Sequence, residues 1–313
     1  MKILITGGLG FIGSHLCDKL IKNNDLTIIT KSTSKIQNIL APSKINIEKI
    51  DITNFSTVEK IIKKNSPEVI IHLAGQTSHS QSFENPLYDV DINSKSTLFM
   101  LETMRKLNLN CEFILGSTFV VVGKPKKLPI NEESPCQPTT IYGANRLLSE
   151  HYCKIYHDVY GLKTKIFRIT NSFGPREQIT ANKNAVNFLI HQEYLNNKIQ
   201  IYFSGKFFRD LIYVDDVVSG IKTVLKKGRS GNLYWISSNT KTWFYQLGNL
   251  LHQLTDVDVK YIDPPPYTKK TDVGNFIVDN SKLKSLGWKP KISVKDGIEK
   301  TIEYFKNNTT FSG

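Results

Sequence analysis

The sequence predicts an α/β protein with a doubly wound parallel sheet, followed by a smaller C-terminal α/β region. Two observations predict this fold. Segments typical of strands alternate with longer amphipathic segments through the first half of the chain. Several strand segments, such as Ile3-Leu4-Ile5 and Val69-Ile70-Ile71, are apolar throughout rather than alternating. Parallel strands that helices cover on both faces have this pattern, and strand–helix alternation with such strands favours the doubly wound architecture.

The elements can be assigned in order along the chain. We expect strands at residues 2–6, 26–30, 45–50, 69–73, 112–116 and 164–169, where short apolar runs occur. We expect helices at residues 11–23, 56–64, 91–107 and 142–160, where the segments are longer and amphipathic. After Thr170 the pattern becomes mixed, with a break at 171–176 and a Pro-rich loop at 263–266. We therefore expect a first domain over residues 1–172, to which 208–228 returns, and a cap over 173–313.

The composition is typical of a globular protein. The length of 313 residues fits about two domains. Contents of 40% hydrophobic and 22% charged residues exclude a disordered chain, a coiled coil and a collagen-like repeat. No apolar run reaches the roughly 18 residues of a membrane span, and the N-terminus has no charged leader, so we expect neither a membrane anchor nor a signal peptide. The four cysteines are far apart with no CxxC pair, which predicts a reduced cytoplasmic protein without a metal site.

The chain is strongly basic. It has 41 Lys and Arg residues against 28 Asp and Glu, for a formal net charge of +13. Such a balance is compatible with nucleic-acid binding or with a pocket for anionic substrates. The basic residues are interspersed with Asn and Ser and form no dense block. We therefore expect a general property of the surface rather than nucleic-acid binding, and a phosphate-bearing substrate remains compatible with it.

A glycine-rich turn follows the first predicted strand and opens the first predicted helix. It has the spacing Gly7-x-x-Gly10-x-x-Gly13. In such a turn one glycine adopts unusual dihedral angles, one lets the backbone approach a pyrophosphate, and one lets the helix pack against the strand. Free N–H groups at the start of the helix then face the anion. The alternative is a plain strand–helix turn. The context favours a Rossmann-type dinucleotide site.

The glycine spacing and the residues that follow it resemble the extended short-chain dehydrogenase/reductases, the NAD(P)-dependent nucleotide-sugar epimerase/dehydratase family that includes UDP-glucose 4-epimerases. Further matches run along nearly the whole chain: Asp51-Ile52, His72-Leu73-Ala74-Gly75, Asn93, Gly116-Ser117-Thr118, the segment 142–146, Arg168, Asn171, the segment 209–216 and the segment 286–290. The resemblance implies a nucleotide-sugar substrate and a homodimer that forms through the helices at 91–107 and 142–160.

The cofactor is indicated by the end of the second strand. In NAD-binding relatives an acidic residue there binds the ribose hydroxyls and repels a 2′-phosphate. Lys31 stands in its place, and Lys31, Ser32 and Lys35 are suited to a 2′-phosphate, so we expect NADP; NAD held by other contacts is the alternative. The resemblance also implies dinucleotide contacts from Gly7, Gly10, Phe11, Ile12, Gly13, Asp51, Ile52, Leu73, Ala74, Gly75, Asn93, Tyr142 and Arg146.

The catalytic residues are expected on the helix at 142–160. A tyrosine that shuttles protons needs a nearby cation, because its unperturbed pKa is about 10. The family carries Tyr-x-x-x-Lys, whose two residues share a helix face. Here Tyr142 matches, but residue 146 is Arg, which has a planar, longer head. Arg146 either does the work of the lysine or leaves a protein that binds without turnover; we favour the first. Thr118, with Ser117 as a second candidate, matches the hydroxyl that contacts the reacting oxygen.

The substrate side departs from the family in two places. The 4,6-dehydratases carry Asp-Glu after the threonine, but this chain has Phe119-Val120, which disfavours dehydration. The resemblance assigns Arg209 and Asn171 to the diphosphate and sugar, and places Lys269 where a second arginine is usual. The histidines at 72, 79, 151 and 191 have no metal-ligand spacing, and we interpret them as structural or solvated.

These observations predict an NADP-dependent oxidoreductase acting on a nucleotide-activated sugar. The specific expectation is reduction of a nucleotide-linked 4-keto-6-deoxyhexose at C4, with Tyr142 as the proton donor. A 4-epimerase with tightly bound NAD is the close alternative. A dinucleotide-sensing or RNA-associated protein without turnover is the alternative from another class.

Overall fold

The computed structural model describes residues 1–177 and 185–308, and its centre is a parallel sheet. In this part of the chain seven strands lie in the order β10-β6-β5-β4-β1-β2-β3, with every neighbouring pair parallel. The strands are β1 (Lys2–Thr6), β2 (Asp25–Thr30), β3 (Asn46–Lys49), β4 (Val69–His72), β5 (Glu112–Thr118), β6 (Lys163–Ile169) and β10 (Asn232–Ile236). The predicted fold class is confirmed.

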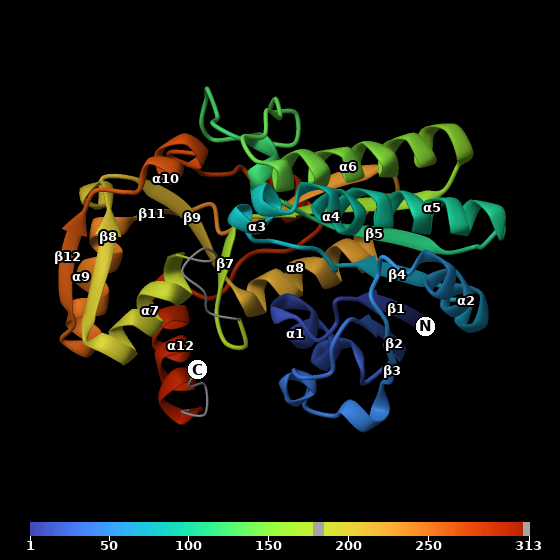
Figure 1. Cartoon of the computed structure of the whole chain (residues 1–313), viewed down its shortest axis with the longest axis horizontal. Helices are drawn as coiled ribbons and strands as arrows, with labels where there is room; N and C mark the ends of the chain where they lie inside the picture. The colour runs from blue at the N-terminus through green and yellow to red at the C-terminus, as the bar shows by residue number, and fades with distance from the viewer. Residues whose placement is uncertain (178–184, 309–313) are drawn as a thin grey trace.

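Helices cover both faces of this sheet (Figure 1). On one face α1 (Phe11–Leu20) and α8 (Val214–Lys227) pack against Ile3 and Ile5. On the other, α2 (Phe55–Asn65), α5 (Ser96–Lys106) and α6 (Ile141–Tyr160) pack against the alternate residue, Leu4. Because both faces are buried, all three β1 residues had to be apolar, which is why the strand reads as a continuous apolar run.

The structure differs from the predicted elements around the fourth strand. The helix expected at 91–107 consists of a π-helical turn, Asp91–Lys95, followed by α5. Two short helices precede it, α3 (His79–Glu84) and α4 (Pro86–Val90). Pro86 begins α4 because a proline fits the first turn of a helix but not its interior. Helices this short have too few turns to produce a recognisable apolar period.

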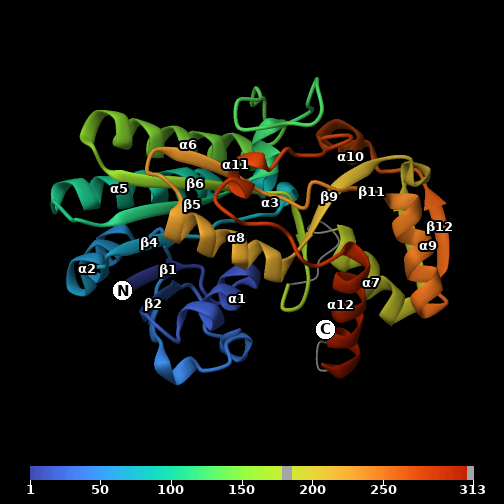
Figure 2. The same ribbon diagram turned by 180° about the vertical axis from the view of Figure 1, so that it is seen from behind.

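The C-terminal part forms two smaller sheets (Figures 1 and 2). In one, β9 (Phe208–Tyr213) lies between β7 (Asn171–Phe173) and β11 (Lys241–Trp243); in the other, β8 (Lys198–Tyr202) pairs with β12 (Asp258–Ile262). The helices of this part are α7 (Ala185–Asn196), α9 (Phe244–Thr255), α10 (Pro266–Thr271), α11 (Ser281–Lys284) and α12 (Val294–Asn307). Of the segment 208–228, residues 208–213 lie in the small sheet, whereas α8 packs on the large sheet. After this segment, β10 joins the large sheet.

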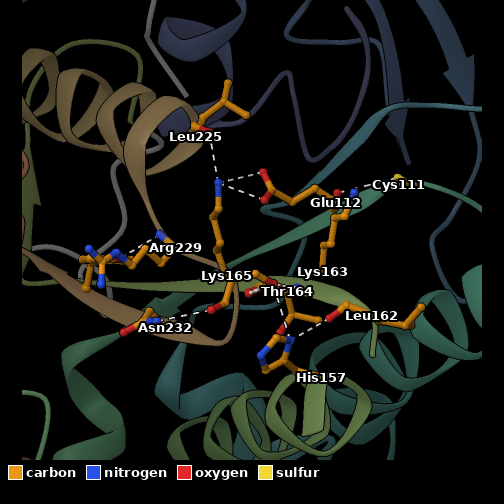
Figure 3. A network of polar contacts seen from close by, with 12 residues as sticks. Cys111, Glu112, His157, Leu162, Lys163, Thr164, Lys165, Leu225, Arg229 and Asn232 are labelled. Carbon is orange, nitrogen blue, oxygen red and sulfur yellow. Dashed lines mark hydrogen bonds and ion pairs between the residues drawn. The ribbon is translucent and has the colours of Figure 1, made fainter. Parts of the chain in front are cut away.

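A buried ion pair ties α8 to the large sheet near the amino ends of its strands (Figure 3). The ammonium of Lys165 on β6 lies 2.9 Å from the carboxylate of Glu112 on β5 and donates a 3.1 Å hydrogen bond to the carbonyl of Leu225. The pair is on the opposite edge from the carboxyl ends of the strands. Within the described ranges no helix has both the length and the apolar character needed to cross a membrane.

Candidate active site

A cavity of about 650 Å³ opens along the carboxyl ends of β1 to β6. It lies where the strand order reverses, between β1 and β4, the usual place for a ligand in an open parallel sheet. Its wall includes every residue predicted to contact the dinucleotide: Gly7, Gly10, Phe11, Ile12, Gly13, Lys31, Ser32, Lys35, Asp51, Ile52, Leu73, Ala74, Gly75, Asn93, Tyr142 and Arg146. Thr118 and Asn171 also line it.

The glycine turn forms a cradle with no room for side chains. Gly7 has φ +72°, which is strained for other residues, and its N–H donates a 3.0 Å hydrogen bond to the carbonyl of Ile29. A Cβ on Gly13 would collide with the carbonyl oxygen of Gly7 and lie 2.8 Å from the Cα of Gly8. The first turn of α1 contains no acidic residue, and its N–H groups have no acceptor within the helix. This cradle fits the pyrophosphate of a dinucleotide.

Lys31 and Asp51 form an ion pair at the outer end of the cavity. Their charged atoms are 3.4 Å apart, and the Lys31 ammonium also donates a 3.3 Å hydrogen bond to the hydroxyl of Tyr88 on α4. Burial acts to raise the pKa of Asp51, but hydrogen bonds from Thr53 and the charge of Lys31 outweigh it and lower that pKa. Tyr88 and Asp51 in turn raise the pKa of Lys31. Both groups are therefore charged where the adenosine end of a dinucleotide would lie.

Tyr142 and Thr118 meet at the inner end of the cavity. Tyr142 is in the first turn of α6, where Thr140 caps the helix by accepting a 3.0 Å hydrogen bond from the N–H of Gly143. Burial raises the pKa of Tyr142; the positive charge of Arg146 and a hydrogen bond with Thr118 lower it, but less. The charge of Arg146 therefore shifts the pKa of Tyr142 in the predicted direction. Burial outweighs this effect, so the expected net lowering of the pKa is not found.

Arg146 lies one helical turn beyond Tyr142, with a side chain that is almost completely buried. Among the described residues its guanidinium forms no hydrogen bond and no ion pair, and it faces the wall of the cavity at Gly75. The side-chain oxygens of Asn93 and Asn171 are also buried there without a partner in the described residues. Donors and acceptors that lack partners on the protein fit the hydroxyl and amide groups of a nicotinamide nucleoside and a sugar.

The two residues that follow Thr118 have apolar side chains. Phe119 and Val120 both line the cavity, and neither can transfer a proton. Elimination of water from a sugar requires an acid and a base next to the carbons involved. The segment that could supply them here supplies only hydrophobic contacts.

Arg209 and Lys269 lie away from this cavity wall. The Arg209 guanidinium is buried, forms a 2.5 Å ion pair with Asp272, donates to the carbonyls of Phe208 and Gly274, and stacks on the ring of Phe207. Lys269 is exposed on α10. The structure therefore does not bring these two predicted substrate contacts together with Tyr142, and their role stays a prediction.

His79 was not expected in the site. It was interpreted as structural or solvated, but its ring lines the cavity with its centroid 5.9 Å from that of Tyr142. Burial lowers its pKa, so the imidazole is neutral at neutral pH. Its position four residues after Gly75, in the segment that follows the carboxyl end of β4, is the signal that could have indicated it. His72, in contrast, lies in the core between the hydroxyls of Thr6 and Ser96.

Comparisons with known proteins agree with this geometry. The family model described as GDP-mannose 4,6 dehydratase matches residues 4–301. A protein of Methanocaldococcus jannaschii named "Putative UDP-glucose 4-epimerase" is 34% identical over 308 residues, which cover 98% of this chain and 99% of that protein. The CDP-paratose 2-epimerase of Salmonella typhi is 29% identical, with 97% of this chain and 99% of that protein covered. The crystal structure of the Thermotoga maritima UDP-glucose 4-epimerase with UDP-glucose superposes with a TM-score of 0.91 at 31% identity, covering 99% of this chain and 100% of that chain.

Proposed function

Because the chain belongs to the family of GDP-mannose 4,6 dehydratase, the extended short-chain dehydrogenase/reductases that act on nucleotide sugars, we propose that it is a 4-epimerase of a nucleotide-activated hexose. One observation carries this proposal: Tyr142, Thr118 and Arg146 lie together at the inner end of the cavity, next to the apolar Phe119 and Val120. This set supports hydride and proton exchange at one carbinol and no elimination. The relatives named as 4-epimerases support the choice of C4.

The chain's own residues provide the proton chemistry. In the oxidation step the C4 hydroxyl of the sugar gives its proton to the oxygen of Tyr142, and the charge of Arg146 favours the ionised tyrosine that can accept it. Thr118 orients both oxygens. A nicotinamide dinucleotide held by the glycine turn, Asn93 and Arg146 would supply the hydride acceptor and donor for C4, and its oxidised form would add a positive charge to that of Arg146. After the 4-keto sugar has presented its other face, Tyr142 returns the proton.

A 4-keto reductase that uses NADPH is the second candidate, and the end of β2 favours it. Lys31, Ser32 and Lys35 line the cavity where an acidic residue would repel a 2′-phosphate. Such an enzyme would reduce a nucleotide-linked 4-keto-6-deoxyhexose at C4, with Tyr142 donating the proton to the new alkoxide. Lys31 is already paired with Asp51, so the additional positive charge that it offers to a phosphate is reduced.

The protein is also proposed to form a homodimer through α5 and α6, which lie side by side (Figure 1). Leu148, Ile155 and Val159 on α6 are 40%, 48% and 67% exposed. Their spacing of seven and four residues places them on one face of the helix. A cluster of exposed large apolar side chains of this kind is typical of a protein–protein interface.

The experiment that tests the function starts with the purified protein. It is denatured, the released dinucleotide is identified by mass spectrometry, and the native protein is incubated with UDP-glucose without added cofactor. Stoichiometric bound NAD and formation of UDP-galactose support the epimerase. An empty site, together with oxidation of added NADPH by a nucleotide-linked 4-keto-6-deoxyhexose, supports the reductase. Absence of both activities, with RNA binding that weakens steeply with salt, would overturn both in favour of a non-catalytic role.

A further inference from the structure

His79 presents a polar ring to the cavity, and no residue in the part of the chain that the structure describes hydrogen-bonds that ring. It is the first residue of α3, and its ring is tilted by 48° to that of Tyr142 at a centroid distance of 5.9 Å. A neutral imidazole has one donor and one acceptor nitrogen. Neither nitrogen forms a hydrogen bond with any residue in the ranges 1–177 and 185–308. A half-buried ring in this state has hydrogen-bonding capacity for a ligand.

The backbone that carries His79 is held in place by Gln76. The side-chain amide of Gln76 donates a 2.7 Å hydrogen bond to the carbonyl of Ser78 and accepts one from the N–H of the same residue. The hydroxyl of Ser78 in turn caps α3 by accepting from the N–H of Gln81 at 3.4 Å. His79 is therefore the first residue of a braced turn, and its ring is presented to the cavity by a fixed backbone.

A single buried carboxylate joins this turn to the helix of Tyr142. Asp89 on α4 is completely buried and accepts a 3.3 Å hydrogen bond from the amide of Gln76 and a 2.7 Å hydrogen bond from that of Asn145. Asn145 is on α6, between Tyr142 and Arg146 in the sequence. The positions of His79 and Tyr142 are thus coupled through Gln76, Asp89 and Asn145.

We propose that His79 hydrogen-bonds a hydroxyl of the sugar near the reacting carbinol, the one on C3 or on C6, and thereby helps to select the sugar. This inference rests on the proposed function, because it requires a nucleotide sugar whose C4 lies at Tyr142. A hydroxyl is both a donor and an acceptor, so it matches a neutral imidazole in either tautomer. A site that hydrogen-bonds a substrate hydroxyl discriminates against analogues without it, because the polar group of the protein is then left unpaired.

The test compares two variants on matched sugars. His79→Val removes the hydrogen bond, and His79→Gln keeps a polar group at similar reach. The probes are UDP-glucose, its 3-deoxy and 6-deoxy analogues, and UDP, which lacks the sugar. We expect His79→Val to raise the KM for UDP-glucose about tenfold, with a smaller rise for His79→Gln. For one deoxy analogue, the kcat/KM of the wild type should be about tenfold lower than for UDP-glucose. For the same analogue, the kcat/KM of His79→Val should be no lower than for UDP-glucose, because the hydrogen bond is already absent. The Kd of UDP should not change.

The outcomes separate this inference from the proposed function. If the kcat/KM for each deoxy analogue falls by the same factor in the wild type and in His79→Val, the imidazole does not contact a sugar hydroxyl. The inference is then overturned, while the epimerase stands. If the variants change only the content of bound dinucleotide, His79 contacts the cofactor instead, which also overturns it. If the wild type neither binds nor converts UDP-glucose and binds no UDP, the proposed function fails and this inference fails with it.

Discussion

The buried carboxylate of Asp89 accepts a 2.7 Å hydrogen bond from Nδ2 of Asn145. Asn145 immediately precedes Arg146 on α6, and the charges of Asp89 and Arg146 both act on Tyr142. Arg146 lowers the pKa of Tyr142 and Asp89 raises it, while burial, the larger effect, also raises it. His79 also faces Tyr142, and burial lowers its pKa, so it is neutral. The activity of the tyrosine therefore depends on opposed charges, and two substitutions should move its pH profile in opposite directions.

Replacement of Arg146 tests the first of these charges. The ionised form of Tyr142 accepts the substrate proton, so kcat/KM rises as the pH passes through the pKa of the tyrosine. Arg146→Met removes the group that lowers this pKa, and the rise should move to higher pH by about one unit or more. Arg146→Lys keeps the charge, and its profile should stay close to that of the wild type. The measurement is the pH dependence of kcat/KM; equal profiles for Arg146→Met and Arg146→Lys would contradict the assigned role.

Replacement of Asp89 should have the opposite effect on the profile. Asp89→Asn removes a negative charge that raises the pKa of Tyr142, so the rise in kcat/KM should move to lower pH. The buried site also loses hydrogen bonds, which should destabilise the fold by roughly 1–3 kcal/mol. Asn145→Ala is the matched control, because it removes the 2.7 Å hydrogen bond but keeps the carboxylate. A shift of the profile to higher pH in Asp89→Asn would show that the charge of Asp89 does not act on the tyrosine.

Replacement of Lys31 tests the choice of cofactor. Lys31→Asp places an acidic side chain at the end of β2, where it can bind ribose hydroxyls and repel a 2′-phosphate. The affinity for NADP relative to NAD should fall by roughly tenfold or more, and the difference should shrink with added salt. Lys44→Asp alters the net charge equally at a residue outside the cavity wall and should leave the ratio unchanged. Dissociation constants for both dinucleotides provide the measurement; an unchanged ratio in Lys31→Asp would exclude Lys31 from cofactor selection.

The dimer proposal can be tested on α6. The double substitution of Ile155 and Val159 by Glu places charges on the exposed apolar face and should give a monomer where the wild type is a dimer. Tyr261→Glu is the control, since Tyr261 is similarly exposed, at 45%, but lies on β12. Light scattering after size-exclusion chromatography measures the mass. A wild-type monomer, or a double variant that still dimerises, would show that this face is not the interface.

The large sheet and the dinucleotide end of the site could be predicted because local patterns encode them. Residues 3–5 and 69–71 must be apolar because both faces of the sheet are buried. In the turn, Gly10 and Gly13 are required by close contacts with its own backbone, and Gly7 by its positive φ. Strand ends in a doubly wound sheet meet at one edge. Residues that follow strands, such as Asp51 and Gly75, could therefore be assigned to one cavity before the structure was known.

The parts that could not be predicted depend on tertiary contacts. α3 is a single short, mostly polar helix without an apolar period, so periodicity does not reveal the approach of His79 to Tyr142, and the position of His79 after β4 is the one signal in the sequence. The buried bridge from Gln76 through Asp89 to Asn145 joins a loop and two helices that are not adjacent in the chain. The net direction of the Tyr142 pKa shift could not be predicted, because it depends on how deeply the side chain is buried, and the spacing of residues does not reveal this. The pairing of Arg209 with Asp272 across 63 positions was equally inaccessible.

The most direct measurement follows a label at the reacting carbon. UDP-glucose that carries deuterium at C4 is incubated with the protein, and the product is analysed by mass spectrometry and NMR. Hydride transfer to a bound nicotinamide and back, with Tyr142 exchanging only the hydroxyl proton, predicts UDP-galactose that retains the deuterium at C4, and no product from Tyr142→Phe. Loss of the deuterium to water, or undiminished conversion by Tyr142→Phe, would contradict the account.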